Sequence, residues 1–140
     1  MKKTKRVLRS LIEKYYRRYK KFRATRLGNN TICAIPWTHL AFEPSGKVVP
    51  CCLTSQYQYF LGDLSTDSIE EIWNGDKMKN LRIDMMNGVE PKICSKCFDT
   101  ERTTGDSSRQ HNNKEFFSVI KNIPKNTLKD GTVPEMNLKY

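Results

Sequence analysis

The sequence has few apolar residues and no long apolar run. Hydrophobic residues make up 37% of the 140 positions, whereas they account for ~45–50% of an ordinary globular domain. No stretch approaches the ~18–20 consecutive apolar residues of a transmembrane helix, and no apolar segment with a small-residue cleavage site marks a secretory signal. We therefore expect one modest cytoplasmic domain with a small core, in which a further interaction helps to stabilise the fold.

The sequence also lacks the common patterns of catalytic and nucleotide-binding sites. It contains no phosphate-binding glycine-rich loop and no dinucleotide fingerprint. No nucleophile is paired with a base, and the two histidines, His39 and His111, stand isolated in the sequence. We interpret both as ordinary histidines and predict no catalytic residue in this chain.

Acidic residues are almost missing from the first 26 positions, which hold 12 Lys and Arg residues and the single acid Glu13. Apolar and aromatic residues recur there at three- and four-residue steps, which predicts a basic amphipathic helix within residues 1–30. This helix either packs its aromatic stripe on the domain, binds an anionic membrane surface through residues 1–26, or contacts nucleic acid. The rest of the chain is nearly neutral, so the charge belongs to the arm and not to the domain.

The middle of the chain has the pattern of a β-hairpin followed by two short helices. Residues 38–42 and 47–49 are rich in strand-forming residues and are joined by a turn that contains Pro and Gly. Ser68 and Glu71 have the spacing of a helix N-terminal capping box, and apolar residues recur over a second helix at residues 77–87. Together these elements predict a small α+β fold.

The pattern is weaker beyond the second helix. Residues 103–113 are polar, which favours a loop, and residues 115–122 have the apolar residues for two helical turns. Asp130-Gly131 predicts a turn, and the alternation over residues 136–140 is typical of the beginning of a strand.

Five cysteines carry the chemistry that the sequence offers. Thiols in a reducing compartment tend to be metal ligands or catalytic groups and not disulfides. Cys94 and Cys97 form a CxxC chelate, the usual building block of a tetrahedral sulfur site. The other candidate metal ligands are Cys33, Cys51 and Cys52. Because adjacent residues of an extended chain point to opposite faces, we expect one of Cys51 and Cys52 to face the site.

Two kinds of centre fit a set of four thiolates. Zinc and iron–sulfur clusters both use such sets, and the ligand count does not separate them. Either centre would connect the hairpin to the CxxC chelate. Because metal binding contributes directly to the free energy of folding, either would make up for the small core.

Several segments of the chain resemble the SPASM/twitch-type auxiliary domain of radical S-adenosylmethionine proteins. The resemblance covers about half of the chain, in the order of the family, between residues 32 and 101. The matching segments are residues 33–40 (CAIPWTHL), residues 46–51 (GKVVPC), residues 61–64 (LGDL), residues 68–74 (SIEEIWN), Arg82 and residues 94–97 (CSKC).

The resemblance implies that the cysteines hold an auxiliary [4Fe–4S] cluster, and it favours a cluster over zinc. Carried over one by one, Cys33, Cys51, Cys94 and Cys97 match the family's ligand positions, with Cys52 as their neighbour. The residues expected to support the centre structurally are Pro36, Trp37, Gly46, Ile72 and Trp73.

The resemblance extends to the branch of the family in which this domain precedes the radical core. Residues 107–113 (SSRQHNN) are similar to the Ser-x-Arg-x-x-x-Asn run that lies between the two parts. We therefore assign residues 31–101 to the SPASM/twitch-like cysteine-rich domain and residues 102–140 to a linker and lead-in strand. The CxxxCxxC motif of the radical core is absent, so the resemblance implies a split or truncated member that reaches S-adenosylmethionine only through a partner core.

The sequence thus predicts an iron–sulfur auxiliary domain that is not catalytic alone. It would work with a radical S-adenosylmethionine core on a separate chain and with a peptide or protein substrate. The alternative is a zinc-stabilised binding module that uses its basic helix on nucleic acid or on an anionic membrane surface.

Overall fold

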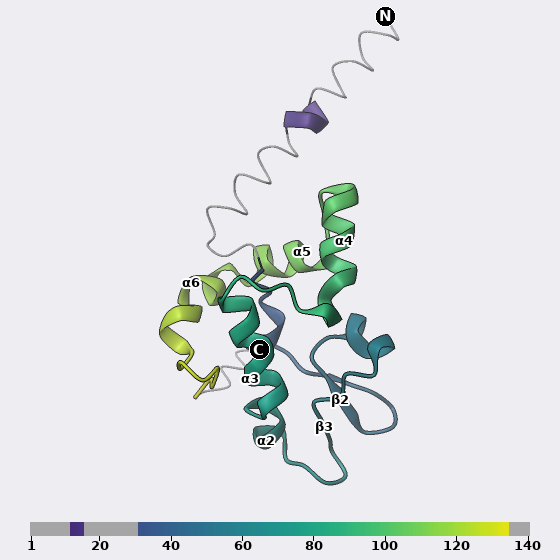
Figure 1. Ribbon diagram of the computed structural model, residues 1–140, viewed down its shortest axis with the longest axis vertical. Helices are drawn as coiled ribbons and strands as arrows, with labels where there is room; N and C mark the ends of the chain where they lie inside the picture. Colours follow the sequence, from purple (N-terminus) through teal and green to yellow (C-terminus); the bar gives the residue numbers. More distant parts are fainter. Residues whose placement is uncertain (1–11, 16–30, 135–140) are drawn as a thin grey trace, which may run out of the picture.

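The computed structural model describes residues 12–15 and 31–134 (Figure 1). Residues 12–15 are helical and exposed to solvent. The rest of the basic helix expected within residues 1–30 lies outside the described residues, as does the strand expected at residues 136–140.

The predicted β-hairpin is present and is the main part of a small antiparallel sheet. Strands β1 (Ala41–Phe42) and β2 (Lys47–Val49) pair with Ala41 opposite Val49. The turn between them places Gly46 at a φ of 86°, a left-handed conformation that glycine adopts without strain. A third strand, β3 (Gly62–Asp63), completes the order β1-β2-β3.

Two helices follow the sheet, as the sequence predicts. Helix α2 (Ile69–Trp73) begins at a capping box, in which the Ser68 hydroxyl accepts from the Glu71 backbone N–H and the Glu71 carboxylate accepts from the Ser68 backbone N–H. Helix α3 (Asp76–Met86) begins after a break at Gly75. In Figure 1, β2, β3 and α2 lie in the lower half of the molecule, with α3 running upward beside them.

The chain beyond α3 is more helical than the sequence predicts. A short 3-10 turn, η3 (Lys92–Cys94), leads into α4 (Ser95–Thr104), which is followed by α5 (Ser108–Glu115) and α6 (Phe117–Asn126). The prediction of a loop over residues 103–113 is therefore wrong. Helix α5 has no apolar stripe to reveal it, but its N-terminus is capped by the Ser107 hydroxyl, which accepts from the Gln110 backbone N–H at 3.3 Å.

The hydrophobic core surrounds α3 and draws on residues of the cysteine-rich segment and of the chain that follows it. The predicted apolar face of α3 is buried, which fits methionine as a filler of irregular core space. Residues of α6 and of the segment after it also enter the core, while the division at residue 101 stays a prediction. The clustered buried residues are Ile32, Ala34, Trp37, Trp73, Met78, Leu81, Met85, Ile120, Ile123 and Val133. The fold is a small α+β domain, as predicted.

Arg82 on α3 is completely buried and connects three parts of the fold. Its Nε donates to the carbonyl of Pro36 at 2.9 Å, and its Nη1 donates to Asn74 Oδ1 and to the carbonyl of Gly131, both at 3.1 Å. The guanidinium also lies 4.5 Å from the centre of the Trp73 ring. Burial lowers the pKa of Arg82 to about 10. The side chain thereby fixes Pro36, three residues after Cys33, against α3.

Within the described ranges, 12–15 and 31–134, no helix has the length and apolar character needed to cross a membrane.

Candidate metal centre

Four of the five cysteines line one pocket. Cys33, Cys51, Cys94 and Cys97 surround a cavity of about 40 Å³, which is larger than the ~10–15 Å³ that a single water requires. Much of the remaining wall is apolar and comes from three 3-10 turns, η1 (Ile35–Trp37), η2 (Cys52–Tyr57) and η3, from α3 and from the residue that follows β2. The apolar residues that line the pocket are Ile35, Pro36, Pro50, Leu53, Leu81, Met85 and Ile93.

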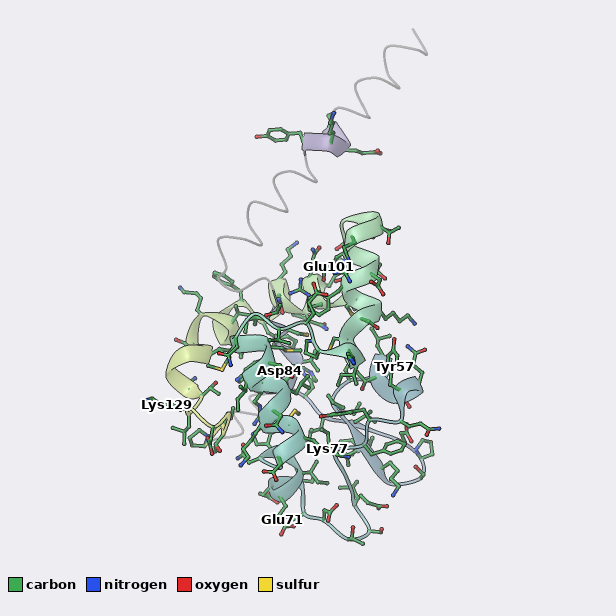
Figure 2. The ribbon with its side chains drawn as sticks, in the orientation of Figure 1. Tyr57, Glu71, Lys77, Asp84, Glu101 and Lys129 are labelled. Atoms are coloured by element: carbon green, nitrogen blue, oxygen red, sulfur yellow. The ribbon has the colours of Figure 1, made fainter. Side chains whose placement is uncertain are left out.

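The four cysteines reach the pocket from three separate segments. Cys33 lies just before the 3-10 turn η1 (Ile35–Trp37), and Cys51 follows β2 at the start of the 3-10 turn η2 (Cys52–Tyr57). Cys94 ends η3 and Cys97 lies in the first turn of α4. A hydrogen bond of 3.1 Å between the hydroxyls of Tyr57 and Ser95 joins η2 to α4. Figure 2 labels Tyr57 on η2, near the lower end of α4.

The structure separates Cys51 from its neighbour. Cys51 is partly buried and lines the pocket, whereas Cys52 is exposed and does not line it. The Cys51 backbone is extended, with φ of −156° and ψ of 148°, and Cys52 begins the 3-10 turn. The Cys52 thiol still lies within hydrogen-bond reach of Cys51 and raises the pKa of Cys51 further, after the larger effect of burial. The Thr54 hydroxyl donates to the Cys51 carbonyl at 2.6 Å and holds this turn in place. The geometry therefore places Cys51, and not Cys52, beside Cys33.

Burial controls the protonation of the pocket thiols. It raises the pKa of Cys33 from 9.0 to about 12, against the opposing effects of a backbone hydrogen bond from Ile35 and of the positive charge of Arg109. Burial also raises the pKa of Cys94 to about 12, and it raises that of Cys51. Because the thiolate is the form that binds a metal and a bound cation favours it, metal binding here must release protons.

Residues 107–113 hold the backbone on both sides of Cys33. Asn113 Nδ2 donates to the Ile32 carbonyl at 2.8 Å, and Asn113 Oδ1 accepts from the Ala34 backbone N–H at 2.8 Å. Arg109 Nη1 donates to the same Ile32 carbonyl at 2.7 Å. Arg109 and Asn113 of the Ser-x-Arg-x-x-x-Asn run therefore act together as a clamp, which holds the backbone around Cys33 by hydrogen bonds.

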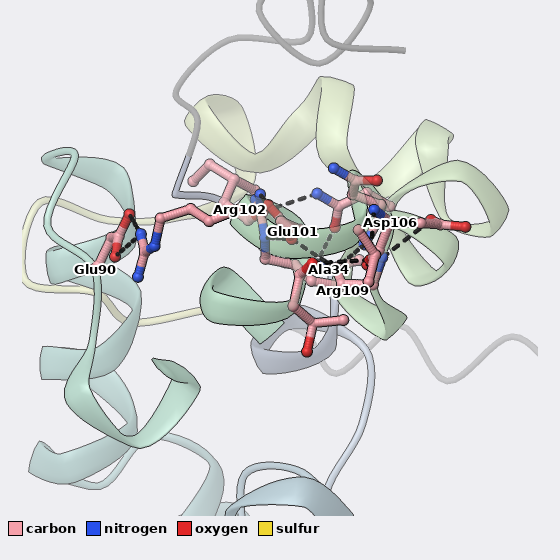
Figure 3. A network of polar contacts seen from close by, with 12 residues as sticks. Ala34, Glu90, Glu101, Arg102, Asp106 and Arg109 are labelled. Atoms are coloured by element: carbon pink, nitrogen blue, oxygen red, sulfur yellow. Dashed lines mark hydrogen bonds and ion pairs between the residues drawn. The ribbon is translucent and has the colours of Figure 1, made fainter. Parts of the chain in front are cut away.

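Arg109 is fixed by a buried carboxylate on α4 (Figure 3). Its Nε donates to Glu101 Oε1 at 2.7 Å and its Nη2 forms an ion pair with Glu101 Oε2, with side chains only 8% and 13% exposed. The Ser107 hydroxyl donates to Glu101 Oε1 at 2.6 Å, and the guanidinium lies 4.7 Å from the centre of the Phe98 ring. The sequence holds no local signal for Glu101, because its partners come from another helix.

The histidines lie away from the pocket wall. His39 is exposed and packs edge-on against Phe116, and His111 is exposed and lies 3.2 Å from the Asp106 carboxylate. Across the part of the chain that the structure describes, no three His, Cys, Asp or Glu side chains are grouped so as to hold a metal ion. The four cysteines are instead arranged around the cavity.

The donor set fits an iron–sulfur cluster. Such clusters are held by cysteine thiolates, and their four-ligand sets combine a CxxC-type pair with more distant cysteines. The charged side chains that line the pocket beside the thiols are the cations Lys96 and Arg109, whose charge complements thiolate ligands. A small α+β domain with a pocket lined by four cysteines is the arrangement expected of a cysteine-ligated metal-binding domain.

Comparison with known families agrees with this expectation. Residues 33–98 match the family model of SPASM, an iron–sulfur cluster-binding domain. This match confirms the resemblance, and the matched range contains all five cysteines. The comparisons with curated proteins and with solved structures gave no match.

Proposed function

We propose that Cys33, Cys51, Cys94 and Cys97 hold a [4Fe–4S] cluster in the pocket and that the chain acts as an auxiliary cluster domain in a radical S-adenosylmethionine enzyme system. The observation that carries the proposal is that these four thiols, all within the range that matches the SPASM family model, line one cavity. Four thiolates are the usual complete ligand set of a [4Fe–4S] cluster. A cluster places several iron atoms between its thiolates, so it suits cysteines that surround a cavity.

The chain's own residues would set the environment of this cluster. When bound, it would supply one-electron transfer at a potential set by net charge, hydrogen bonds to sulfur and solvent exposure. The apolar wall, which includes Leu81 and Met85, limits the access of water to the thiolates. The clamp formed by Asn113 and Arg109 keeps Cys33 at the pocket.

The proposed partner is a radical S-adenosylmethionine core. The 140 residues contain no CxxxCxxC motif, so S-adenosylmethionine would bind to a core supplied by a separate chain or by a continuation of this one. In that arrangement the auxiliary cluster would transfer electrons or position the substrate, for which we propose a peptide or protein. The match to the SPASM family model supports this partnership.

The adjacent cysteines provide a matched test of the ligand set. We expect Cys51→Ser to reduce the amount of cluster formed on anaerobic reconstitution with iron and sulfide. Since the loss of a residue that only supports a ligand typically costs ~10–100-fold in metal affinity, the loss of a ligand is expected to cost at least as much. Cys52→Ser, which changes an exposed thiol outside the pocket, is expected to load like the unaltered chain.

The readouts are the iron and sulfide content and the absorption spectrum, with circular dichroism as the check on folding. Cluster loss in Cys52→Ser together with normal loading of Cys51→Ser would contradict the proposed ligand set. Zinc bound without sulfide by the unaltered chain would support the alternative of a zinc-stabilised module.

A further inference from the structure

Arg109 connects the polar network that it forms with Glu101 and Ile32 to the pocket that the cysteines line. It is 7% exposed and lines the same cavity as the four thiols. Glu101, its ion-pair partner, does not line that cavity. The pair is therefore oriented with its positive end toward the cysteines and its negative end away from them.

The guanidinium is held in this orientation from several sides. Glu101 accepts two of its N–H groups, the Ile32 carbonyl accepts a third, and Phe98 packs against the planar face. Arginine has five N–H donors, so two remain that no hydrogen bond among the described residues uses. A side chain fixed in this way cannot swing its charge into solvent, in contrast to the exposed Lys96 on the same pocket wall.

The positive charge of Arg109 faces a cavity that cysteines from three segments line. In a cavity with an apolar wall, a fixed positive charge favours any gain of negative charge beside it. A cluster ligated by four thiolates gains one negative charge on reduction, and the net charge around a cluster is one of the factors that set its potential.

We propose that Arg109 is a positioning residue that compensates the negative charge of the cluster and raises its reduction potential, and that Glu101 holds it in place and moderates its effect. The inference rests on the proposed function, because it requires a cluster in the pocket. It goes further by naming the residues that tune the centre without ligating it.

The test is the midpoint potential of the reconstituted full chain, measured by anaerobic potentiometric titration. We expect Arg109→Met to lower the ratio of reduced to oxidised cluster about tenfold at a fixed potential, which is a shift of about 59 mV to more negative values for a one-electron couple. Arg109→Lys keeps the charge and is expected to restore most of the potential. Glu101→Gln removes the opposing charge and is expected to shift the potential to more positive values.

A structural role alone would give a different result. Asn113→Ala breaks the clamp on Ile32 and Ala34 without changing any charge, so it is expected to lower stability and leave the potential unchanged. Arg109→Met leaves the largely shielded carboxylate of Glu101 without its counter-charge, which is expected to be destabilising. Where that variant does not fold, the double variant Glu101→Gln/Arg109→Met is compared with Glu101→Gln, and the double variant is expected to have the more negative potential.

Two negative results are distinguishable. Potentials that stay the same in Glu101→Gln and in the Arg109 variants, with a cluster present in each, would overturn the role of Arg109 and leave the proposed function standing. An unaltered chain that takes up no iron and sulfide would overturn both.

Discussion

At Cys33 and Cys94, burial raises the pKa of the thiol, and a metal binds the thiolate form. Both residues are partly buried, and the loss of contact with water raises the pKa of each thiol to about 12. A thiolate shielded from water is costly unless a cation accompanies it, so these two thiols are neutral when no cation is bound. Under the proposed function, the same two residues would become thiolates when the cluster binds. The stability of the chain without a cluster is then expected to depend on pH.

The stability of the metal-free protein is expected to fall as the pH rises from 9 toward 12. The pKa of Cys33 is about 12 in the folded chain, compared with 9.0 for an ordinary thiol, so the folded state keeps its proton where the unfolded state loses it. The contribution of Cys33 to the free energy of unfolding is complete below pH 9 and is lost as the pH rises through 12. Urea unfolding of the metal-free chain across this interval measures it.

Two serine variants isolate the contribution of the pocket. Cys33→Ser is expected to weaken the pH dependence, because it removes one of the buried thiols. Cys52→Ser changes an exposed thiol and is expected to keep the dependence of the unaltered chain. A free energy of unfolding with the same pH slope in both variants would show that Cys33 is not buried as a neutral thiol.

The sequence predicts part of this site at residue level. The CxxC spacing singles out Cys94 and Cys97, and the alternation rule reduces Cys51 and Cys52 to one candidate without selecting it. The selection depends on the backbone direction at the end of β2, which is a property of the folded chain. The pairing of Arg109 with Glu101 could not be predicted either, because it joins two helices through a contact that leaves no periodic pattern.

At the scale of elements, local signals explain which parts of the fold are predictable. The hairpin and the start of α2 have a turn sequence and a capping box, and both are confirmed. Strand β3 has only two residues and no alternating pattern, since it is held by backbone pairing with β2. Helix α5 is polar and was expected to be a loop. It is stabilised by the Ser107 cap and by the buried Arg109.

The segment after α6 is joined to the core by specific contacts. Trp37 Nε1 donates to the Thr127 hydroxyl at 2.8 Å, and the Gly131 carbonyl accepts from Arg82. Gly131 also has a φ of 85°, in the predicted turn. A Cβ at this position would lie 2.5 Å from the Lys79 carbonyl oxygen on α3. Only glycine fits this approach of the segment to α3.

Gly131→Ala is therefore expected to be more destabilising than Gly46→Ala. Both positions have a positive φ, which costs an alanine ~1–2 kcal/mol. At Gly46 the nearest atom to the new Cβ is 3.4 Å away, an ordinary contact. At Gly131 the clash with α3 adds the cost of overpacking, about 1–3 kcal/mol. Equal free energies of unfolding for the two variants, measured in urea, would show that the segment does not pack against α3 as described.

At the scale of the whole molecule, the cysteine-lined pocket joins segments that are distant in sequence. The cysteines come from the segment before η1, the end of β2 and the η3–α4 junction. The hydrophobic core is small, and the proposed cluster, bound to all three segments, would add its binding free energy to folding. Helices α5 and α6 complete the unit, because they supply the clamp on Cys33 and part of the core.

The measurement that tests the central claim most directly is the iron, sulfide and zinc content of the full chain purified under strictly anaerobic conditions, with an absorption spectrum of the same sample. We predict iron and sulfide in equal amounts, near one [4Fe–4S] cluster per chain, with the broad visible absorption of a thiolate-bound cluster. One zinc per chain, with no sulfide and no colour, would contradict the account.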